Sequence, residues 1–308
     1  MMARERRNLT LHILIVPAII LISVYLYFPI ISTVFLSLFE INNFNLDTRF
    51  FIGLTNYTKL FRDPLFWVAL RNTVVMTLTT LFIQMPIAFF LADFLSNQVR
   101  KNHPRLEAWL LLGLFFPIVL PTAVLAKSWS LFFSGLQGAG FGPFEWITLK
   151  LGLTNFITNL FKTKTVLLLS ELKTAIWILV GMQTWAAIGF NLVIYRSAIL
   201  SISPEIYESA EMDGAGPWVK LFYITTPLTR NVINLTVILA ILGVFQLFDM
   251  VWLTTRGQPL NTTQVLATYM YTRSFVDLRT GYGSTIAIFI LVTSVGLSLI
   301  QRRIFRET

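Results

Sequence analysis

Long apolar segments recur along this 308-residue chain, and they constrain the fold more than any other feature. Crossing the hydrocarbon core of a bilayer takes about 20 residues of α-helix, and backbone polar groups in lipid must be satisfied within the segment. Charged residues make up only 13% of the chain, against about 25% in a soluble domain. We therefore predict an all-α membrane protein with six transmembrane helices, at about residues 13–39, 72–95, 108–132, 174–201, 228–253 and 282–300.

The first apolar segment follows a short basic tail, as the core of a secretory signal would. It is too long for a signal, and no small-residue cleavage site follows it, so we predict a transmembrane helix. The predicted organisation is a tail at residues 1–11, the first helix and an external loop at 12–71, a five-helix permease core at 72–301 that contains the loop 203–228, and a second tail at 302–308.

Two prolines, Pro117 and Pro121, lie inside the third predicted helix. Proline has no N–H to donate, but membrane helices tolerate it where neighbouring groups satisfy the freed carbonyls. We therefore expect a kink in this helix.

The orientation in the membrane follows from loop charge. Six crossings place both termini on one side, and Lys and Arg are denser in the short loops of that side, although the totals on the two sides are nearly equal. This bias predicts cytoplasmic termini.

Motifs for catalysis, metal binding and nucleotide binding do not occur in the sequence. There is no cysteine, and His12 and His103 stand in no metal-ligand spacing. The phosphate-binding pattern G-x-x-x-x-G-K-[ST] is missing, and Gly214-Ala215-Gly216 followed by Lys220 has the wrong spacing for it. The basic residues are dispersed, which argues against nucleic acid as a partner. We expect no enzyme active site and no metal or cofactor bound by this chain.

The polar interval at residues 203–228 lies between two long apolar segments and has the pattern of two helices joined by a turn. Ser203 and Pro204 fit the N-cap and the first residue of a helix. Asp213-Gly214 is expected to end that helix, and Gly216-Pro217 to begin the second.

Each of the two predicted helices has a distinctive face. Glutamates recur every three residues on the first helix and form an acidic stripe of Glu205, Glu208 and Glu211. On the second, the spacing i, i+3, i+4 and i+7 predicts an apolar ridge of Trp218, Leu221, Phe222 and Thr225. Such a loop is suited to docking on another protein.

The string from Tyr207 to Gly216, followed by Ile224 and Pro227, resembles the EAA loop of permease subunits of ABC importers, in the carbohydrate branch of that family. Ser209 replaces the first alanine of the family pattern, and Thr226 stands where leucine is usual. The resemblance implies a cytoplasmic coupling loop whose first helix fits a cleft on an ATPase subunit, with Glu208 paired to an arginine there. The implied docking residues are Glu205, Tyr207, Glu208, Ser209, Ala210, Asp213, Gly214 and Ala215.

A second resemblance follows the fifth predicted helix. The residues that carry it are similar to a region of the first, MalF-like permease subunit of sugar importers, with Gln258 in place of a glycine: Phe248-Asp249, Leu253-Thr254, Gly257, Pro259, Thr262-Thr263 and Gly281-Tyr282-Gly283-Ser284. Together the two resemblances cover about residues 51–300.

Polar side chains inside membrane spans are costly and usually face a cavity or a partner group. The resemblance to maltose permease places its sugar-lining positions at Gln183 and Phe190 on the fourth helix, where amide and aromatic character is kept, and at mostly apolar positions elsewhere. The resulting candidate solute pathway comprises Gln183, Ala187, Phe190, Asn191, Gly243, Val244, Phe245, Gln246 and Leu247. The alternative is that Gln183 and Gln246 hold helices together by hydrogen bonds.

These observations predict an inner-membrane permease subunit of an ATP-driven importer for a sugar, oligosaccharide, or related polyol or glycerol-phosphate solute. The implied partners are a second homologous permease, two ATP-binding subunits that carry the ATP and Mg²⁺, an external solute-binding protein and the lipid bilayer. Alternatives are a permease for another solute class, a secondary transporter and a membrane scaffold. The sequence shows no evident inverted repeat and no mid-span carboxylate, which disfavours a secondary transporter.

Overall fold

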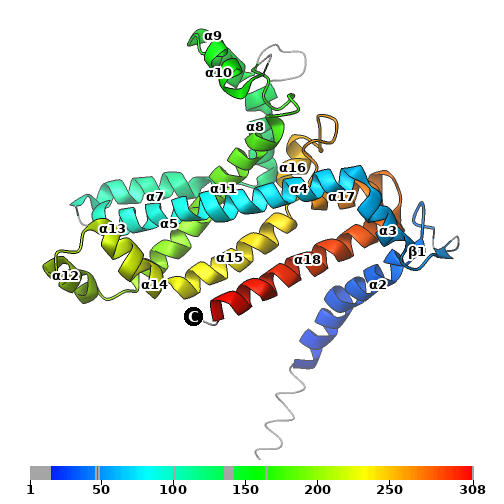
Figure 1. Ribbon diagram of the computed structural model, residues 1–308, viewed down its shortest axis with the longest axis horizontal. Coiled ribbons are helices and arrows are strands. Elements are labelled where there is room, and N and C mark those ends of the chain that lie inside the picture. Colours follow the sequence, from blue (N-terminus) through cyan, green and yellow to red (C-terminus); the bar gives the residue numbers. More distant parts are fainter. Residues whose placement is uncertain are drawn as a thin grey trace, which may run out of the picture. The chain divides into compact units, whose positions relative to one another are not determined.

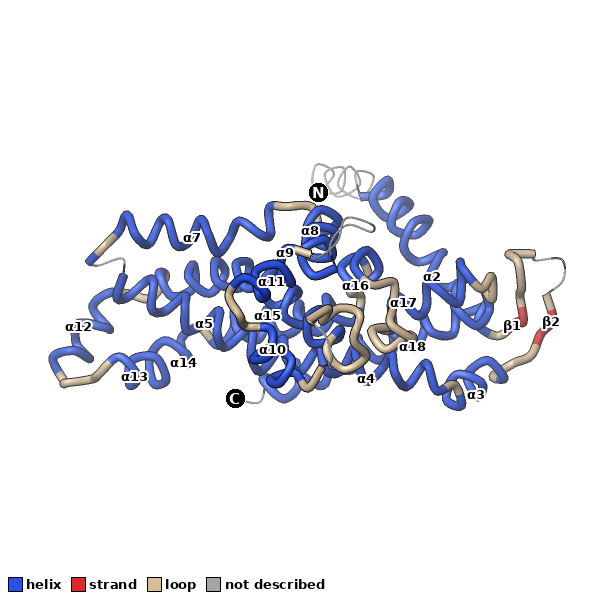
Figure 2. Tube along the Cα trace, turned by 90° about the horizontal axis from the view of Figure 1, so that it is seen from above, coloured by secondary structure: helices blue, strands red, loops and turns tan. Residues whose placement is uncertain are grey.

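The computed structural model describes residues 15–45, 47, 49–99, 102–134, 142–163 and 166–306. The predicted tail at residues 1–11 and His12 lie outside the described residues. Within them the chain forms two compact units. The first holds the chain up to Asp63 together with Met270–Val292, and the second holds Pro64–Tyr269 and the chain from Thr293. The two units are described in turn (Figures 1 and 2).

The first unit is helical apart from one short β-ladder. Its elements are the helix Ile15–Ser37, which contains the π-helical turn η1 (Ser23–Tyr27) and α2 (Phe28–Ser37), then β1 (Phe39–Glu40), β2 (Phe50–Phe51), α3 (Thr55–Arg62), η5 (Thr272–Val276) and the first part of α18 (Thr280–Arg306).

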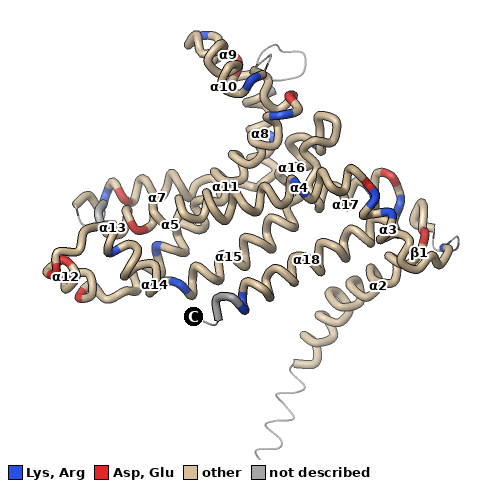
Figure 3. Tube along the Cα trace, in the orientation of Figure 1, with Lys and Arg blue, Asp and Glu red and all other residues tan. Residues whose placement is uncertain are grey.

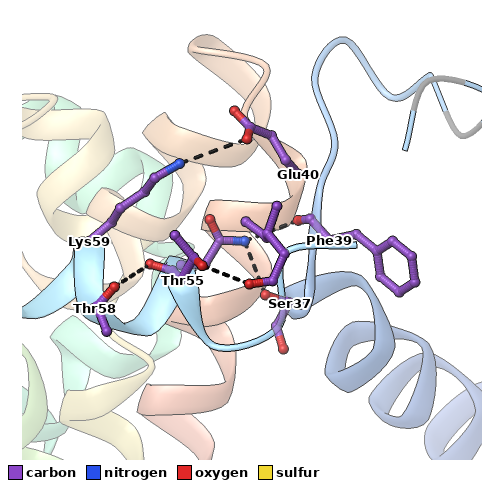
Figure 4. Close-up of polar contacts among 8 residues, drawn as sticks. Ser37, Phe39, Glu40, Thr55, Thr58 and Lys59 are labelled. Carbon is purple, nitrogen blue, oxygen red and sulfur yellow. Dashed lines mark hydrogen bonds and ion pairs between the residues drawn. The ribbon is translucent and has the colours of Figure 1, made fainter. Parts of the chain in front are cut away.

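The ladder of the first unit is antiparallel, with Phe39 opposite Phe51. The buried Asn56 amide donates hydrogen bonds to the carbonyl oxygens of Ser37 and Phe39, both at 3.0 Å, and so joins α3 to the end of α2 and to β1. Figure 4 shows these contacts, together with the 3.8 Å ion pair between Lys59 and Glu40.

The second unit is a helical bundle. It contains α4 (Pro64–Thr79), η2 (Thr80–Gln84), α5 (Met85–Phe94), η3 (Leu95–Val99), α7 (Pro104–Val119), α8 (Thr122–Ser134), α9 (Pro143–Lys150), α10 (Thr154–Phe161), α11 (Ala175–Leu200), α12 (Pro204–Met212), α13 (Pro217–Lys220), η4 (Leu221–Thr225), α14 (Thr226–Leu228), α15 (Arg230–Phe245), α16 (Asp249–Thr254), most of α17 (Leu266–Tyr271) and the end of α18.

Helix α11 packs against both α5 and α7 (Figure 1). A fully buried cluster that includes Leu192, Tyr195 and Ile199 of α11 and Ala88 and Ala92 of α5 fills the first of these contacts. Gly189 of α11 lies so close to the backbone of Leu114 that a Cβ there would overlap the Leu114 carbonyl oxygen. Small residues of this kind let membrane helices approach closely, because apolar attraction to a neighbouring helix gains little over lipid.

Four described helices are long and apolar enough to cross a membrane: Ile15–Ser37, Pro64–Asn97, Ala175–Leu200 and Thr280–Arg303. Two bent helix pairs also meet the length and hydropathy requirements when each is taken together: Pro104–Val119 with Thr122–Phe133, and Pro217–Leu228 with Arg230–Phe245. Counting each pair as one crossing gives the predicted total of six and confirms the predicted fold class.

The kink predicted in the third helix is instead a break. The axes of α7 and α8 differ by 98°, because Leu120, the residue before Pro121, takes an extended backbone conformation that cannot continue a helix.

The prediction of a continuous fifth helix at residues 228–253 is wrong. Helix α15 ends at Phe245, and three residues separate it from α16. Met250 and Val251 of α16 are buried against Ala126 of α8 and Leu179 of α11, so packing of α16 redirects the chain.

Candidate functional site

The loop at residues 203–228 has the predicted helix–turn–helix form. Helix α12 starts at Pro204 after Ser203, although the Ser203 side chain makes no capping hydrogen bond. Gly214 takes a positive φ of 79°, which lets the Ala215 N–H bond the Ala210 carbonyl oxygen at 2.8 Å and close the end of α12. Helix α13 then begins at Pro217, as predicted.

Acidic residues are concentrated along α12 and the turn that follows it (Figure 3). Glu205, Glu208 and Asp213 are exposed, and among the described residues none of the three forms an ion pair. The third glutamate of the predicted stripe, Glu211, instead binds Lys220 of α13 at 2.7 Å and links the two helices. Among the other predicted docking residues, Ser209 and Gly214 are exposed, whereas Ala210 and Ala215 are half-buried.

Tyr207 points the other way and is 8% exposed. Its hydroxyl lies 2.9 Å from the hydroxyl of Thr225, and Thr225 donates to an Asp93 carboxylate oxygen at 3.2 Å. Burial raises the pKa of the Tyr207 hydroxyl above its usual range, and the hydrogen bond to Thr225 offsets part of that rise. Tyr207 therefore stays a neutral donor and faces the bundle, apart from the acidic surface.

The apolar ridge predicted on the second helix is divided in the structure. Leu221 and Thr225 are buried, whereas Trp218 and Phe222 are 61% and 63% exposed. The π-helical turn η4 hydrogen-bonds five residues apart, so side chains do not keep α-helical spacing through it. Trp218 stacks instead on Phe90 of α5, with ring centroids 5.5 Å apart.

A second candidate site is a cavity of about 270 Å³ in the same unit, which we call the α7–α8 cavity. It lies where α7 is separated from α8 and where α15 is separated from α16, and residues of α11 also line it. Its lining residues are Pro117, Ile118, Leu120, Thr122, Leu125, Gln183, Ala186, Ala187, Gly243, Gln246, Leu247, Phe248, Asp249 and Met250.

The structure brings together five of the nine predicted pathway residues at the α7–α8 cavity: Gln183, Ala187, Gly243, Gln246 and Leu247. The other four do not line it. Val244 and Phe245 are buried at 3% and 2% exposure, Asn191 is buried, and Phe190 is exposed.

Sequence reasoning missed the contributions of α7 and α8 to the lining and that of Asp249. The available signal was the pair Pro117 and Pro121, because a broken helix leaves a gap that neighbouring side chains can line.

The cavity offers hydrogen-bonding groups on mostly apolar walls. Among the described residues the Gln183 side chain makes no hydrogen bond, so its amide is available to a bound molecule. Amide and carboxylate groups can bind hydroxyls, and the Phe248 ring offers an apolar surface, a combination that suits a hydroxyl-rich solute. No group of three or more metal-ligating side chains occurs in the described part of the chain.

A larger cavity of about 610 Å³ lies within the first unit, and none of its lining residues is a predicted site residue. Four of its charged side chains, Glu40, Lys59, Asp63 and Asp277, form ion pairs within the same unit. Glu40 pairs with Lys59, and Asp63 pairs with Arg273 at 3.5 Å and accepts a hydrogen bond from Tyr282 at 2.9 Å.

Comparison with known proteins gives a consistent result. The family described as "Binding-protein-dependent transport system inner membrane component" matches residues 84–308. The chain is 31% identical over 296 residues to the probable ABC transporter permease protein YurN of Bacillus subtilis, with 96% of this chain and 95% of that protein covered. It is 30% identical over 301 residues to the lactose transport system permease protein LacF of Rhizobium radiobacter, with 95% and 93% covered.

The fold is similar to a chain in the crystal structure of a bacterial alginate ABC transporter in complex with an alginate pentasaccharide-bound periplasmic protein. The TM-score is 0.81 at 22% identity, and 99% of this chain and 96% of that chain are covered.

Proposed function

The chain belongs to the family of binding-protein-dependent transport system inner membrane components, and on that premise we propose that it is the membrane-spanning permease subunit of an ATP-driven importer for a sugar-type solute. A sugar, an oligosaccharide or a related polyol is the proposed cargo. Lactose in the name of one relative and alginate at the structural neighbour support this class. The free amide of Gln183 and the Phe248 ring at the α7–α8 cavity fit such a molecule.

The observation that carries the proposal is the exposed acidic face of α12. Glu205 and Glu208 extend from a short helix whose other side is anchored by Tyr207. A charged helix presented this way suits a groove with basic groups on another protein, where charge complementarity selects the partner and its register. We assign that partner to an ATP-binding subunit, with Glu208 paired to one of its arginines.

The remaining partners follow from the same assignment. Two ATP-binding subunits would hold the ATP and Mg²⁺ and carry out hydrolysis, so this chain would have no catalytic residue. A second, homologous permease would complete the pathway, and an external solute-binding protein would deliver the cargo. Both termini and the 203–228 loop would then lie in the cytoplasm, on the inner side of the cell membrane.

The proposed mechanism is alternating access. Closure of the ATP-binding subunits would move α12, and the bundle would respond by exposing the α7–α8 cavity to one side of the membrane and then to the other. A binding partner shifts such an equilibrium only if it binds one of the two states more tightly than the other. The ATP-binding subunits would meet this condition by binding α12 more tightly in one state.

The test is recovery of the ATP-binding subunit with the tagged permease after co-expression with the partner subunits of the same organism. Glu208→Lys reverses a charge at the proposed contact, and we expect recovery to fall by about tenfold or more, because like charges at a desolvated contact cost several kcal/mol. The control is Glu145→Lys on α9, outside the 203–228 loop, which should leave recovery unchanged. Normal recovery and normal ATP-dependent uptake with Glu208→Lys would contradict the proposal.

A further inference from the structure

We infer that Tyr207, Thr225 and Asp93 form a hydrogen-bonded relay that carries movement of α12 to α5, the inner part of the second membrane crossing. The inference rests on the proposed function, because it names the residues through which nucleotide-driven movement would enter the bundle. It also gives Tyr207 a different role from the exposed docking residues: Tyr207 acts inside the permease.

The relay joins three elements that are separate in the sequence. Tyr207 lies on α12, Thr225 on η4 and Asp93 near the end of α5. The Tyr207 and Thr225 hydroxyl oxygens are 2.9 Å apart, and Thr225 Oγ1 is 3.2 Å from Asp93 Oδ1. Asn97, one turn beyond Asp93, donates its Nδ2 hydrogen to the same carboxylate oxygen at 2.8 Å and holds it in place.

The direction of the hydrogen bonds makes the links interdependent. Thr225 has one hydroxyl proton and donates it to Asp93. Its oxygen must therefore accept the proton of Tyr207. Thr225 is fully buried, so removal of the Tyr207 hydroxyl leaves an acceptor there that water cannot readily satisfy.

Apart from the relay, the contacts between α12 and the bundle do not fix their relative positions. A cavity of about 400 Å³ lies beside Tyr207, lined also by Ser96 and Asn97 of η3 and by Pro204 and Glu208 of α12, so α12 is not tightly packed on this side. The Glu211–Lys220 ion pair joins α12 to α13. The stack of Trp218 on Phe90 is apolar and can slide, whereas the hydrogen bonds fix relative positions.

A matched pair of variants separates this role from the ordinary loss of a buried hydrogen bond. Tyr195 on α11 is also buried, and its hydroxyl lies 2.8 Å from the hydroxyl of Thr236 on α15, within the bundle. Tyr207→Phe and Tyr195→Phe each remove a tyrosine hydroxyl that is hydrogen-bonded to a threonine, although the Tyr207 hydroxyl also interacts with Asn97. A merely structural role predicts the same consequence for both variants.

The first readout is the distance between α12 and α5 in the complete complex. The chain has no cysteine, so spin labels can be placed with Met212→Cys and Ile87→Cys, at positions 89% and 43% exposed. A complex without the two introduced cysteines, treated with the same label, measures the signal that comes from cysteines of the partner subunits. With the relay intact, or with Tyr195→Phe, we expect the distance to stay the same when ATP and vanadate trap the complex. With Tyr207→Phe we expect it to change on trapping, because α12 moves without α5.

The second readout is ATP hydrolysis in proteoliposomes with and without the solute-binding protein. Tyr207→Phe should lower the stimulation by the binding protein roughly fivefold, the factor that one net hydrogen bond is worth. Tyr195→Phe should leave it unchanged. Thr225→Val should reproduce the Tyr207→Phe result and Thr225→Ser should restore it, so the threonine pair decides the question if Tyr207→Phe does not assemble.

Equal behaviour of Tyr207→Phe and Tyr195→Phe in both readouts would overturn the relay while leaving the proposed function intact. An unsubstituted complex that shows no ATP hydrolysis with the solute-binding protein present would overturn the proposed function, and the relay with it.

Discussion

In the 203–228 loop, residues close in the sequence hold the two helices and their turn together: Ala215 bonds Ala210, five positions away, and Lys220 pairs with Glu211, nine positions away. The α7–α8 cavity is built differently. Its lining comes from segments around residues 117, 183 and 246, which are far apart in the sequence. The loop is thus a local structure presented to partners, whereas the cavity exists only because helices pack around two breaks.

The difference predicts where each region is sensitive. Substitutions in the loop should alter coupling and partner binding at small cost to folding. Substitutions at the contacts between the helices that surround the cavity should destabilise the bundle. Substitutions that change only a side chain lining the cavity should alter solute affinity. Four pairs of measurements test this division, from the largest expected effect to the smallest.

The largest effect is expected at the contact between α7 and α11. In Gly189→Ala the new Cβ would overlap the Leu114 carbonyl oxygen and lie 2.9 Å from the Phe115 Cα, so α7 must shift. Overpacking of this kind costs about 1–3 kcal/mol. Thermal unfolding of the purified protein should show a clear loss of stability. Gly181→Ala on the same helix is the control, because nothing lies within 4 Å of its new Cβ, and it should be neutral or slightly stabilising. Equal stability of the two variants would remove the assigned close contact.

At the cavity lining, Gln183→Leu should raise the half-saturation concentration for uptake roughly 5- to 150-fold, because a solute hydroxyl then loses its partner at a cost of about 1–3 kcal/mol. The solute is first identified as the ligand of the partner binding protein. Thermal stability should stay unchanged, since the Gln183 side chain makes no hydrogen bond among the described residues. Lower stability with unchanged affinity would mean that Gln183 holds helices together. No change in either quantity would place the solute on the second permease.

Two ion pairs compare the bundle with the loop directly. Arg196 donates from Nε and Nη2 to the buried Glu107 carboxylate at 2.9 and 2.6 Å, joining α11 to α7, whereas the Glu211 carboxylate bound to Lys220 is 47% exposed. Glu107→Gln should lower the free energy of unfolding by about 2 kcal/mol, because hydrogen bonds to charged groups are worth about 1.5–3. Glu211→Gln should cost at most about 1 kcal/mol. The comparison fails if chemical denaturation shows a larger loss in the free energy of unfolding for Glu211→Gln than for Glu107→Gln.

The smallest effect is expected at the turn of the loop. Gly214 has φ +79° and Gly216 has φ −71°, and nothing lies within 4 Å of a Cβ added to either. Gly214→Ala should therefore cost about 1 kcal/mol from backbone strain alone, while Gly216→Ala should be tolerated. Hydrogen–deuterium exchange of the α12 backbone should be faster in Gly214→Ala only. Equal exchange in both variants would show that the turn relaxes without strain.

Much of the architecture could be predicted from local signals. Proline at the first helical position placed the starts of α12 and α13, and Gly214 placed the end of α12, because caps and turns depend on residues close in the chain. The six apolar segments were confirmed for a similar reason, since the length of a crossing depends on bilayer thickness and helix rise.

Other features depend on residues that the sequence keeps far apart. The α-helical spacing predicted that Trp218 and Leu221 lie on one face. They do not, because a π-helical turn begins at Leu221 and Trp218 stacks on the ring of Phe90. The break after Phe245 carries no proline or glycine, and it arises because Met250 and Val251 find a buried position against Ala126 and Leu179.

By itself, the sequence determined that this chain crosses a membrane as helices and carries a helix–turn–helix loop between two of its crossings, because hydrophobic length and backbone preference act locally. Only the tertiary structure decided that Tyr207 faces Thr225 and Asp93, and that five of the nine predicted pathway residues share one cavity. Which side chains meet depends on helix rotation and on the positions of breaks, and packing between distant segments sets both.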